Sequence, residues 1–342
     1  MSKSRRNIAL SVMLGAYLAA LHTGRRRVLR ASIPEVVKAP ENALVLGSGG
    51  LLGAAWMAST LSDLENKSIW KPEIDDLRIG TSAGSMLAVI LGNGIKASEI
   101  VALMVNGDYQ DDKGILSVPK TPTREKVPLR PSDILYAVRS LAQGRAPHLG
   151  IIVSSLFVEG AEDTSELETF INEITNSNWP STNTWLVSAE LQSGLRKVFT
   201  GKDEIAPGEA VAASCAVPAL YRPVKIKGGQ YIDGGTISCS NLDLAIHARA
   251  KNIIVLTPIA GYTRININSG VNKALSQIVR NTEQIGMSKI FKKIGTDTKI
   301  TLVTPGKATS EFLSTNSLMD GSKVKELLEI MSSEEPVIME SK

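Results

Sequence analysis

The sequence has few of the residues on which several kinds of protein chemistry depend. Only two of its 342 residues are cysteines, Cys215 and Cys239, which is too few for a disulfide framework and indicates free thiols in a reducing compartment. A single bridge between them stays open. No Cys/His cluster has the spacing of a zinc site, so we expect no metal centre. Aromatic residues make up only 4 %, so the core must come mainly from Ala, Val, Ile and Leu.

No apolar run reaches the length of a membrane-spanning helix. The longest covers residues 8–21, which is 14 residues, whereas a bilayer needs about 20. Residues 1–40 carry a net charge of +7, and the rest of the chain nets −3. An apolar segment with basic flanks is typical of a helix lying in the membrane interface on anionic lipid. A signal peptide and a helix packed on the rest of the protein are the alternatives.

This charge distribution leads to an expectation about partners and location. A basic terminus suits an anionic partner, either lipid headgroups or nucleic acid, and the rest of the chain has the charge of a neutral enzyme body. We expect residues 1–30 to contact a membrane surface, and we expect no nucleic-acid partner. The protein is then cytoplasmic or peripheral to the membrane, with export as the minor alternative.

A strand, a glycine-rich turn and a helix follow one another twice within fifty residues. Both units predict a parallel sheet with crossover helices. In such a sheet the helix carries the chain back to the edge where the previous strand began, so that the next strand runs in the same direction. The first unit is 43–46, 47–50 and 51–64, and the second is 77–79, 80–84 and 85–91.

The remaining pattern alternates between further elements and one long loop. Residues 108–147 are rich in proline and charge, which predicts a loop with one short helix at 133–141 that acts as a lid or is an insertion without a role. Elsewhere the pattern predicts helices at 167–174, 211–215, 271–294 and 324–331, strands at 185–189, 196–200, 253–257 and 299–303, and a hairpin at 221–232.

Ser82 is the strongest candidate for a reactive side chain. It lies between Gly80 and Gly84, after a predicted strand and before a predicted helix, which is the context of a nucleophile elbow. Such a turn pushes the hydroxyl outward and aims the positive end of the next helix at the reacting centre. The alternative is a glycine-rich turn with a capping serine.

The earlier glycine turn, Gly47 to Gly53, exposes backbone N–H groups at the start of a helix. Such donors hold a phosphate or an oxyanion. Leu52 stands where a dinucleotide-binding turn needs glycine, and no Lys-Ser/Thr follows as a phosphate-binding loop requires. An oxyanion hole paired with Ser82 is therefore the favoured interpretation, and an unrelated structural turn is the alternative.

The general base is less evident from the residues alone. Asp233 ends a predicted strand before Gly234 and Gly235, where it could accept the serine proton or merely bond its own turn. His247 completes the chain order of a Ser-Asp-His triad, but a helical segment separates it from Asp233.

Taken together, these motifs resemble the patatin-like phospholipase family over residues 43–258. The glycine turn, Gly-Thr-Ser-Ala-Gly, Ala213-Ser214-Cys215-Ala216-Val217-Pro218 and Asp-Gly-Gly occur in the family's order, and Asn241 follows. The resemblance implies an α/β fold, a three-layer α/β/α sandwich with a mainly parallel central sheet. It divides the chain into a basic segment and linker (1–40), a catalytic core (43–258) and helices and a strand that complete the same domain (259–342).

The resemblance also implies a mechanism and its residues. Fatty-acyl esters of phospholipids or related glycerolipids are cleaved by a Ser82–Asp233 dyad through an acyl-enzyme, with no metal and no cofactor. The backbone N–H groups of Gly49, Gly50 and Leu51 form the oxyanion hole. The motif glycines are Gly47, Gly53, Gly80, Gly84, Gly234 and Gly235.

Two positions depart from the family pattern. Ser48 replaces the first glycine of the turn, and Leu52 replaces the usual Arg or Lys before its last glycine. The lost cation bears on headgroup preference. A catalytically reduced protein that keeps the fold and binds lipid or membrane is the alternative function.

Overall fold

The computed structural model describes residues 33–71, 76–111, 114–117, 162–180, 183–218, 220–259 and 297–341. The basic apolar segment and the helices expected at 133–141 and 271–294 lie outside these residues.

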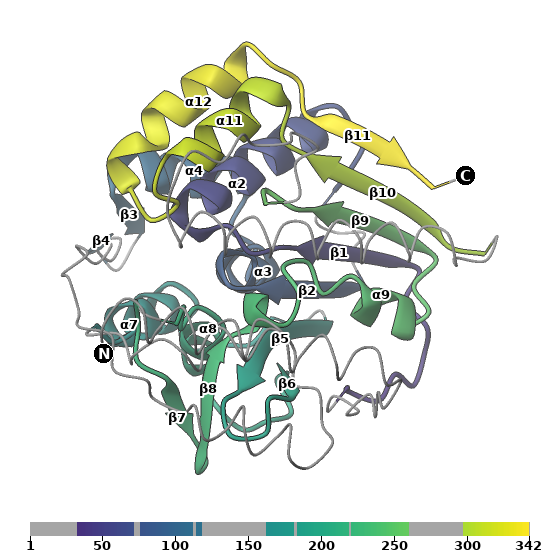
Figure 1. The fold of residues 1–342 in the computed structure, drawn as a ribbon, viewed down its shortest axis with the longest axis vertical. Helices are drawn as coiled ribbons and strands as arrows, with labels where there is room; N and C mark the ends of the chain where they lie inside the picture. Colours follow the sequence, from purple (N-terminus) through teal and green to yellow (C-terminus); the bar gives the residue numbers. More distant parts are fainter. Residues whose placement is uncertain are drawn as a thin grey trace, which may run out of the picture.

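A mixed sheet of nine strands forms the centre of the molecule (Figure 1). Its parallel part has the order β10 (Lys299–Thr304), β9 (Asn252–Leu256), β1 (Asn42–Leu46), β2 (Leu77–Thr81) and β5 (Asn183–Glu190). Antiparallel strands complete it: β11 (Val337–Glu340) beside β10, β6 (Arg196–Phe199) and β8 (Gly229–Asp233) beside β5, and β7 (Val224–Ile226) beside β8. The expected sheet is thus parallel only in its centre.

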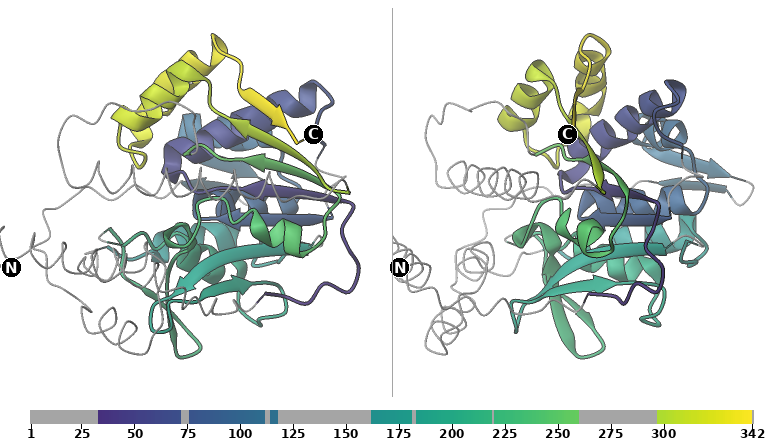
Figure 2. Two further views of the ribbon diagram at one scale, coloured as in Figure 1. Left: turned by 45° about the vertical axis from the view of Figure 1, so that its right-hand side comes forward. Right: turned by 90° about the vertical axis from the view of Figure 1, so that its right-hand side faces the viewer.

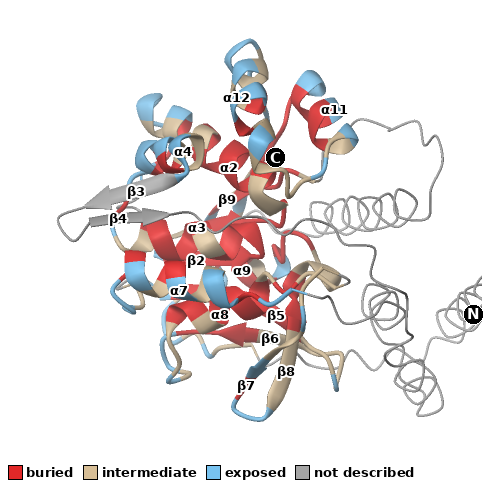
Figure 3. Cartoon of the chain, turned by 90° about the vertical axis from the view of Figure 1, so that its left-hand side faces the viewer, coloured by how far each residue is buried: buried red, intermediate tan, exposed pale blue. Residues whose placement is uncertain are grey.

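The central strands are buried on both faces, since every residue of β2 and all but the first of β1 are buried. In β1, Leu44 and Leu46 belong to one hydrophobic cluster, whereas Ala43 and Val45 belong to another. Because neighbouring side chains of a strand point to opposite faces, these clusters are the two layers of core. Figure 3 shows buried residues in the central strands and in the helices beside them.

Helices pack against both faces of the sheet, as the expected three-layer arrangement requires (Figure 2). α9 (Asp243–His247) packs on one face with the smaller cluster. The larger cluster is built with α2 (Gly50–Asn66), α3 (Ala83–Gly92), α4 (Ala97–Asn106), α7 (Ser165–Ile174), α8 (Pro207–Ser214), α11 (Lys307–Thr315) and α12 (Val324–Ser332).

Five elements were not expected from the sequence. A hairpin of β3 (Asp108–Asp111) and β4 (Gly114–Ser117) occupies the start of the segment expected to be a loop. Each strand has four residues, too few for its alternation to stand out among the prolines and charges nearby. α4, α11 and β11 were not expected either. α4 buries residues spaced by three, Ala97, Ile100 and Leu103, and ends at Gly107 with φ +81°.

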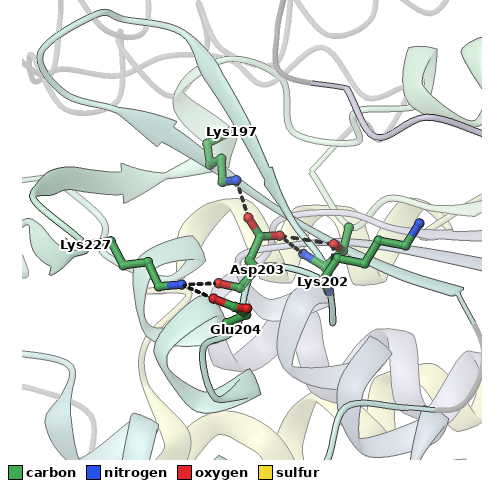
Figure 4. A network of polar contacts seen from close by, with 6 residues as sticks. Lys197, Lys202, Asp203, Glu204 and Lys227 are labelled. Carbon is green, nitrogen blue, oxygen red and sulfur yellow. Dashed lines mark hydrogen bonds and ion pairs between the residues drawn. The ribbon is translucent and has the colours of Figure 1, made fainter.

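An ion-pair network holds the loop between β6 and α8 (Figure 4). The Asp203 carboxylate pairs with Lys197 of β6 and accepts the Thr200 N–H at 2.7 Å. Lys227, at the β7–β8 turn, donates to the Asp203 carbonyl at 2.7 Å. The network ties the segment before α8 to β6 and to the β7–β8 turn. The last residue of α8, Ser214, lies at the candidate site described next.

Candidate active site

Ser82 lies in a sharp turn between β2 and α3, with φ 54° and ψ −123°. An L-residue rarely adopts this conformation, and a nucleophile elbow requires it. A Cβ atom on Gly80 would lie 2.4 Å from the Gly84 carbonyl oxygen, and one on Gly84 would lie 2.0 Å from the Leu46 carbonyl oxygen. Only glycine therefore fits on either side of Ser82, as the sequence motif predicted.

The elbow is held by hydrogen bonds from two neighbouring serines. The Ser82 N–H donates to Ser214 Oγ at 2.9 Å, and Ser214 Oγ donates to the Val187 carbonyl at 2.6 Å. Ser85 Oγ donates to the Ser82 carbonyl at 2.6 Å. Ser214 thus ties the strained turn to β5. In the sequence, Ser214 stood out only as part of the motif at residues 213–218, and nothing there indicated its contact with Ser82.

Asp233 lies at the end of β8, close enough to the Ser82 side chain for that hydroxyl to lower the pKa of its carboxyl group. Its Oδ1 accepts the Gly235 N–H at 2.7 Å, and its own N–H donates to the Ala216 carbonyl at 3.0 Å. A Cβ atom on Gly234 would lie 2.3 Å from the Val187 carbonyl oxygen, so this turn packs directly on β5. Ser82 and Asp233, 151 positions apart in the sequence, are thus brought together.

Both side chains are shielded from water, since Ser82 and Asp233 are each 4 % exposed. Burial disfavours the charged carboxylate and raises the pKa of Asp233 to about 6. The hydrogen bonds from Ser82 and from the Gly235 N–H oppose this shift. The carboxyl group is therefore ionised at neutral pH and is a stronger base than an ordinary aspartate.

Cys215 follows α8 and lies beside this pair. Its Sγ is 3.8 Å from Ser85 Oγ. Burial and the nearby Asp233 carboxylate raise the pKa of the Cys215 thiol to about 12. The thiol therefore stays protonated at neutral pH and does not compete with Ser82 as a nucleophile.

The glycine turn between β1 and α2 lies next to the elbow, because Leu46 and Gly80 are paired in the parallel register. The Gly47 N–H donates to the Leu256 carbonyl at 2.9 Å. Among the described residues, the N–H groups of Gly49, Gly50 and Leu51 have no acceptor. These are the first donors of α2, where the helix dipole favours negative charge. Gly53 packs against the side chain of Pro258.

A distant segment covers one side of this turn, and the sequence did not predict it. The Leu52 N–H donates to the Leu318 carbonyl at 3.0 Å. Gly50 has φ +59°, and a Cβ atom there would lie 2.7 Å from the same carbonyl oxygen and 3.0 Å from Met319 Sδ. The segment after α11 therefore occupies the fourth donor of the helix and leaves the first three.

Leu52 is fully buried in the larger hydrophobic cluster, with 0 % exposure. A lysine or arginine at this position would have to bring its charge into that core. The departure from the family pattern is therefore a packing feature of this chain, and the backbone donors of the turn are still present.

His247 does not join the other candidate residues. It is the last residue of α9, and its side chain is exposed, whereas Asp233 is buried. His22 and His148 lie outside the described residues. Within the described part of the chain, no group of three or more His, Cys, Asp or Glu could hold a metal ion.

Comparison with known families adds to this geometry. The family model described as Patatin-like phospholipase matches residues 44–246, a span that contains both glycine turns, Ser82 and Asp233. The chain belongs to the patatin-like phospholipase family. At the level of the family it is therefore a lipid hydrolase acting on ester bonds.

Similar solved structures include VipD from Legionella pneumophila, at 14 % identity and a TM-score of 0.37, with 92 % of this chain and 71 % of VipD covered. The type III effector ExoU also has 14 % identity, with a TM-score of 0.30, and 89 % of this chain and 55 % of ExoU are covered. ExoU in complex with SpcU from Pseudomonas aeruginosa gives 14 % identity and a TM-score of 0.29, with the same coverage. No curated protein matches the chain. The family match alone carries the assignment.

Among the described residues, no helix is both long enough and apolar enough to cross a membrane.

Proposed function

We propose that this patatin-like protein cleaves fatty-acyl esters of phospholipids or related glycerolipids, using Ser82 as nucleophile and Asp233 as general base. The observation that carries the proposal is that the buried Ser82, at a strained elbow, and the buried Asp233 carboxyl group lie beside each other. The unpaired N–H groups at the start of α2, beside that elbow, add support.

In the acylation step, Ser82 Oγ attacks the ester carbonyl carbon and its proton passes to Asp233. The carbonyl oxygen becomes an oxyanion, which accepts hydrogen bonds from the Gly49, Gly50 and Leu51 N–H groups. The intermediate collapses, the bond to the glycerol oxygen breaks, and Asp233 gives its proton to the leaving alcohol. The acyl group is then an ester on Ser82.

In the second step a water molecule attacks the acyl carbon, and Asp233 again accepts the proton. Collapse breaks the bond to Ser82 Oγ, the proton returns to Ser82, and the fatty acid leaves. We further propose that the protein works peripherally on a membrane surface that residues 1–30 contact, since their net positive charge suits anionic lipid.

A lipid panel with purified full-length protein tests this function. Vesicles of phosphatidylcholine, phosphatidylethanolamine or phosphatidylglycerol, and emulsions of diacylglycerol, are assayed for fatty-acid release. We expect Ser82→Ala and Asp233→Asn to lower fatty-acid release by about 10³-fold or more, because Asp233 must accept the proton that the Ser82 hydroxyl loses as it attacks. His247→Ala is the matched control and should stay within about twofold of wild type, since its side chain is exposed whereas Asp233 is buried.

Loss of activity in His247→Ala would contradict the dyad. A folded wild-type protein that binds vesicles but releases no fatty acid from any lipid would contradict hydrolysis. Vesicle binding that survives Ser82→Ala would then identify a non-catalytic lipid-binding protein.

A further inference from the structure

Ser48 is a buried polar residue that the proposed mechanism leaves without a role. It is 7 % exposed, and its Oγ has no hydrogen-bond partner among the described residues. Burying a hydroxyl without a partner is unfavourable. Because this unpaired hydroxyl lies beside a candidate active site, it can form a hydrogen bond with a molecule that takes part in the reaction, such as water.

The Ser48 hydroxyl faces the same point as the Asp233 carboxylate. A Cβ atom built on Gly235 would lie 2.6 Å from Ser48 Oγ and 2.9 Å from Asp233 Oδ1. The two oxygens are therefore no farther apart than the sum of these distances. One water molecule can bridge such a span with two hydrogen bonds.

The backbone fixes Ser48 in this place. Its N–H donates to the Cys239 carbonyl at 2.8 Å, and the preceding Gly47 N–H is bonded to β9. Strand register places the turn beside the elbow, because Leu46 pairs with Gly80, two residues before Ser82. The hydroxyl is thus held on a rigid element close to both members of the proposed dyad.

We propose that Ser48 is a positioning residue for the water that releases the acyl group, an inference that rests on the proposed function. The water donates one O–H to Asp233 Oδ1 and the other to Ser48 Oγ, which leaves an oxygen lone pair free for the acyl carbon. The new carbon–oxygen bond forms as the proton passes to Asp233. The bond from the acyl carbon to Ser82 Oγ then breaks, Ser82 Oγ takes the proton back, and a carboxylic acid leaves.

This role separates the two halves of the reaction. Acylation needs Ser82, Asp233 and the backbone donors, and no water takes part in it. Deacylation needs a water held at a defined angle, and misplacement of a reactant costs on the order of tenfold to a hundredfold in rate. Removing the Ser48 hydroxyl is therefore expected to slow the second step alone.

The experiment uses full-length protein and p-nitrophenyl butyrate in a stopped-flow burst assay, with the acyl-enzyme followed by intact-protein mass spectrometry. Ser48→Ala and Ser48→Gly both remove the hydroxyl, and the glycine restores the residue of the family turn. We expect the burst rate to stay within about twofold and acyl-Ser82 decay to slow on the order of tenfold to a hundredfold. Added hydroxylamine, a stronger nucleophile than water, should restore turnover.

Thr60→Val is the control, because Thr60 in α2 is another buried hydroxyl without a partner among the described residues and lies two residues past the midpoint of the helix. It should leave both steps unchanged. Unchanged acyl-enzyme decay in both Ser48 variants would overturn the inference, as would an equal slowing of burst and decay. If wild type itself shows neither burst nor turnover, the proposed function fails and this inference falls with it. A wild type that turns over separates the two failures.

Discussion

Ser82 combines a buried hydroxyl with a backbone conformation that glycine adopts far more readily, at φ 54° and ψ −123°. The strain is tolerated because Ser214, Ser85 and close backbone contacts of Gly80 and Gly84 hold the turn. This arrangement keeps the hydroxyl next to Asp233 at a cost in stability, as strained functional residues generally do.

The strain predicts opposite effects on stability and activity at this residue. Ser82→Gly removes both the hydroxyl and the strain, whereas Ser82→Ala removes the hydroxyl alone. We expect the free energy of unfolding of Ser82→Gly to exceed that of Ser82→Ala by about 1–2 kcal/mol, with both variants inactive. Urea unfolding followed by circular dichroism measures this, and a less stable glycine variant would show that the elbow is unstrained.

The raised pKa of Asp233 predicts the pH dependence of hydrolysis. The base must be ionised, and folding raises its pKa from 3.8 to about 6, so activity is lost as pH falls through about 6 instead of about 4. We expect kcat/KM for a soluble ester to rise with pH as a single titration near 6 and then to level off. The same profile in His247→Ala is the control. A midpoint near 4 would contradict a buried base.

At the scale of helices and strands, α2 both carries the proposed oxyanion donors at its start and packs into the hydrophobic core along its length. Its first three N–H groups have no acceptor among the described residues, and its fourth is bonded to Leu318. Leu52 begins the buried side of the helix. The packing of this first turn therefore determines where the donors point.

Restoring the family's cation at position 52 tests this packing. Leu52→Lys places a charge in the larger hydrophobic cluster, where Leu52 has 0 % exposure. We expect a loss of about 3–5 kcal/mol in the free energy of unfolding, measured by urea denaturation. Leu52→Met is the control of similar volume and should cost less than about 1.5 kcal/mol. A lysine variant as stable as wild type would show that this position reaches solvent.

The same scale shows why the sequence predicted some features and missed others. The elbow, the first glycine turn and the 221–232 hairpin depend on residues close together in the chain, and their glycines mark the turns directly. The contact of Leu318 with α2 and that of Ser214 with Ser82 join distant segments, and nothing local encodes them. The buried place of Leu52 was also unpredictable, because it depends on α2 packing against the sheet and the C-terminal helices.

At the scale of the whole molecule, nine of the described strands form one sheet that runs from β7 to β11, and β3 and β4 pair separately. β10 and β11, beyond the end of the family match, extend the same sheet. Ile33 and Val36 pack against the smaller hydrophobic cluster, so the core begins before β1.

This boundary defines a deletion that tests the basic segment. We expect a chain beginning at Ile33 to keep its activity on a soluble ester, because Ile33 and Val36 remain on the core. It should bind anionic vesicles at least about tenfold more weakly, since the net positive charge near the N-terminus is lost. Vesicle sedimentation with neutral vesicles as control measures this. Undiminished binding to anionic vesicles would place the lipid-binding surface elsewhere.

The most direct measurement of the central claim is labelling with a fluorophosphonate probe, followed by peptide mass spectrometry. We predict that folded wild-type protein is labelled on Ser82, that Ser82→Ala is not labelled, and that Asp233→Asn is labelled far more slowly. A folded wild-type protein that stays unlabelled, or is labelled at another residue, would contradict it.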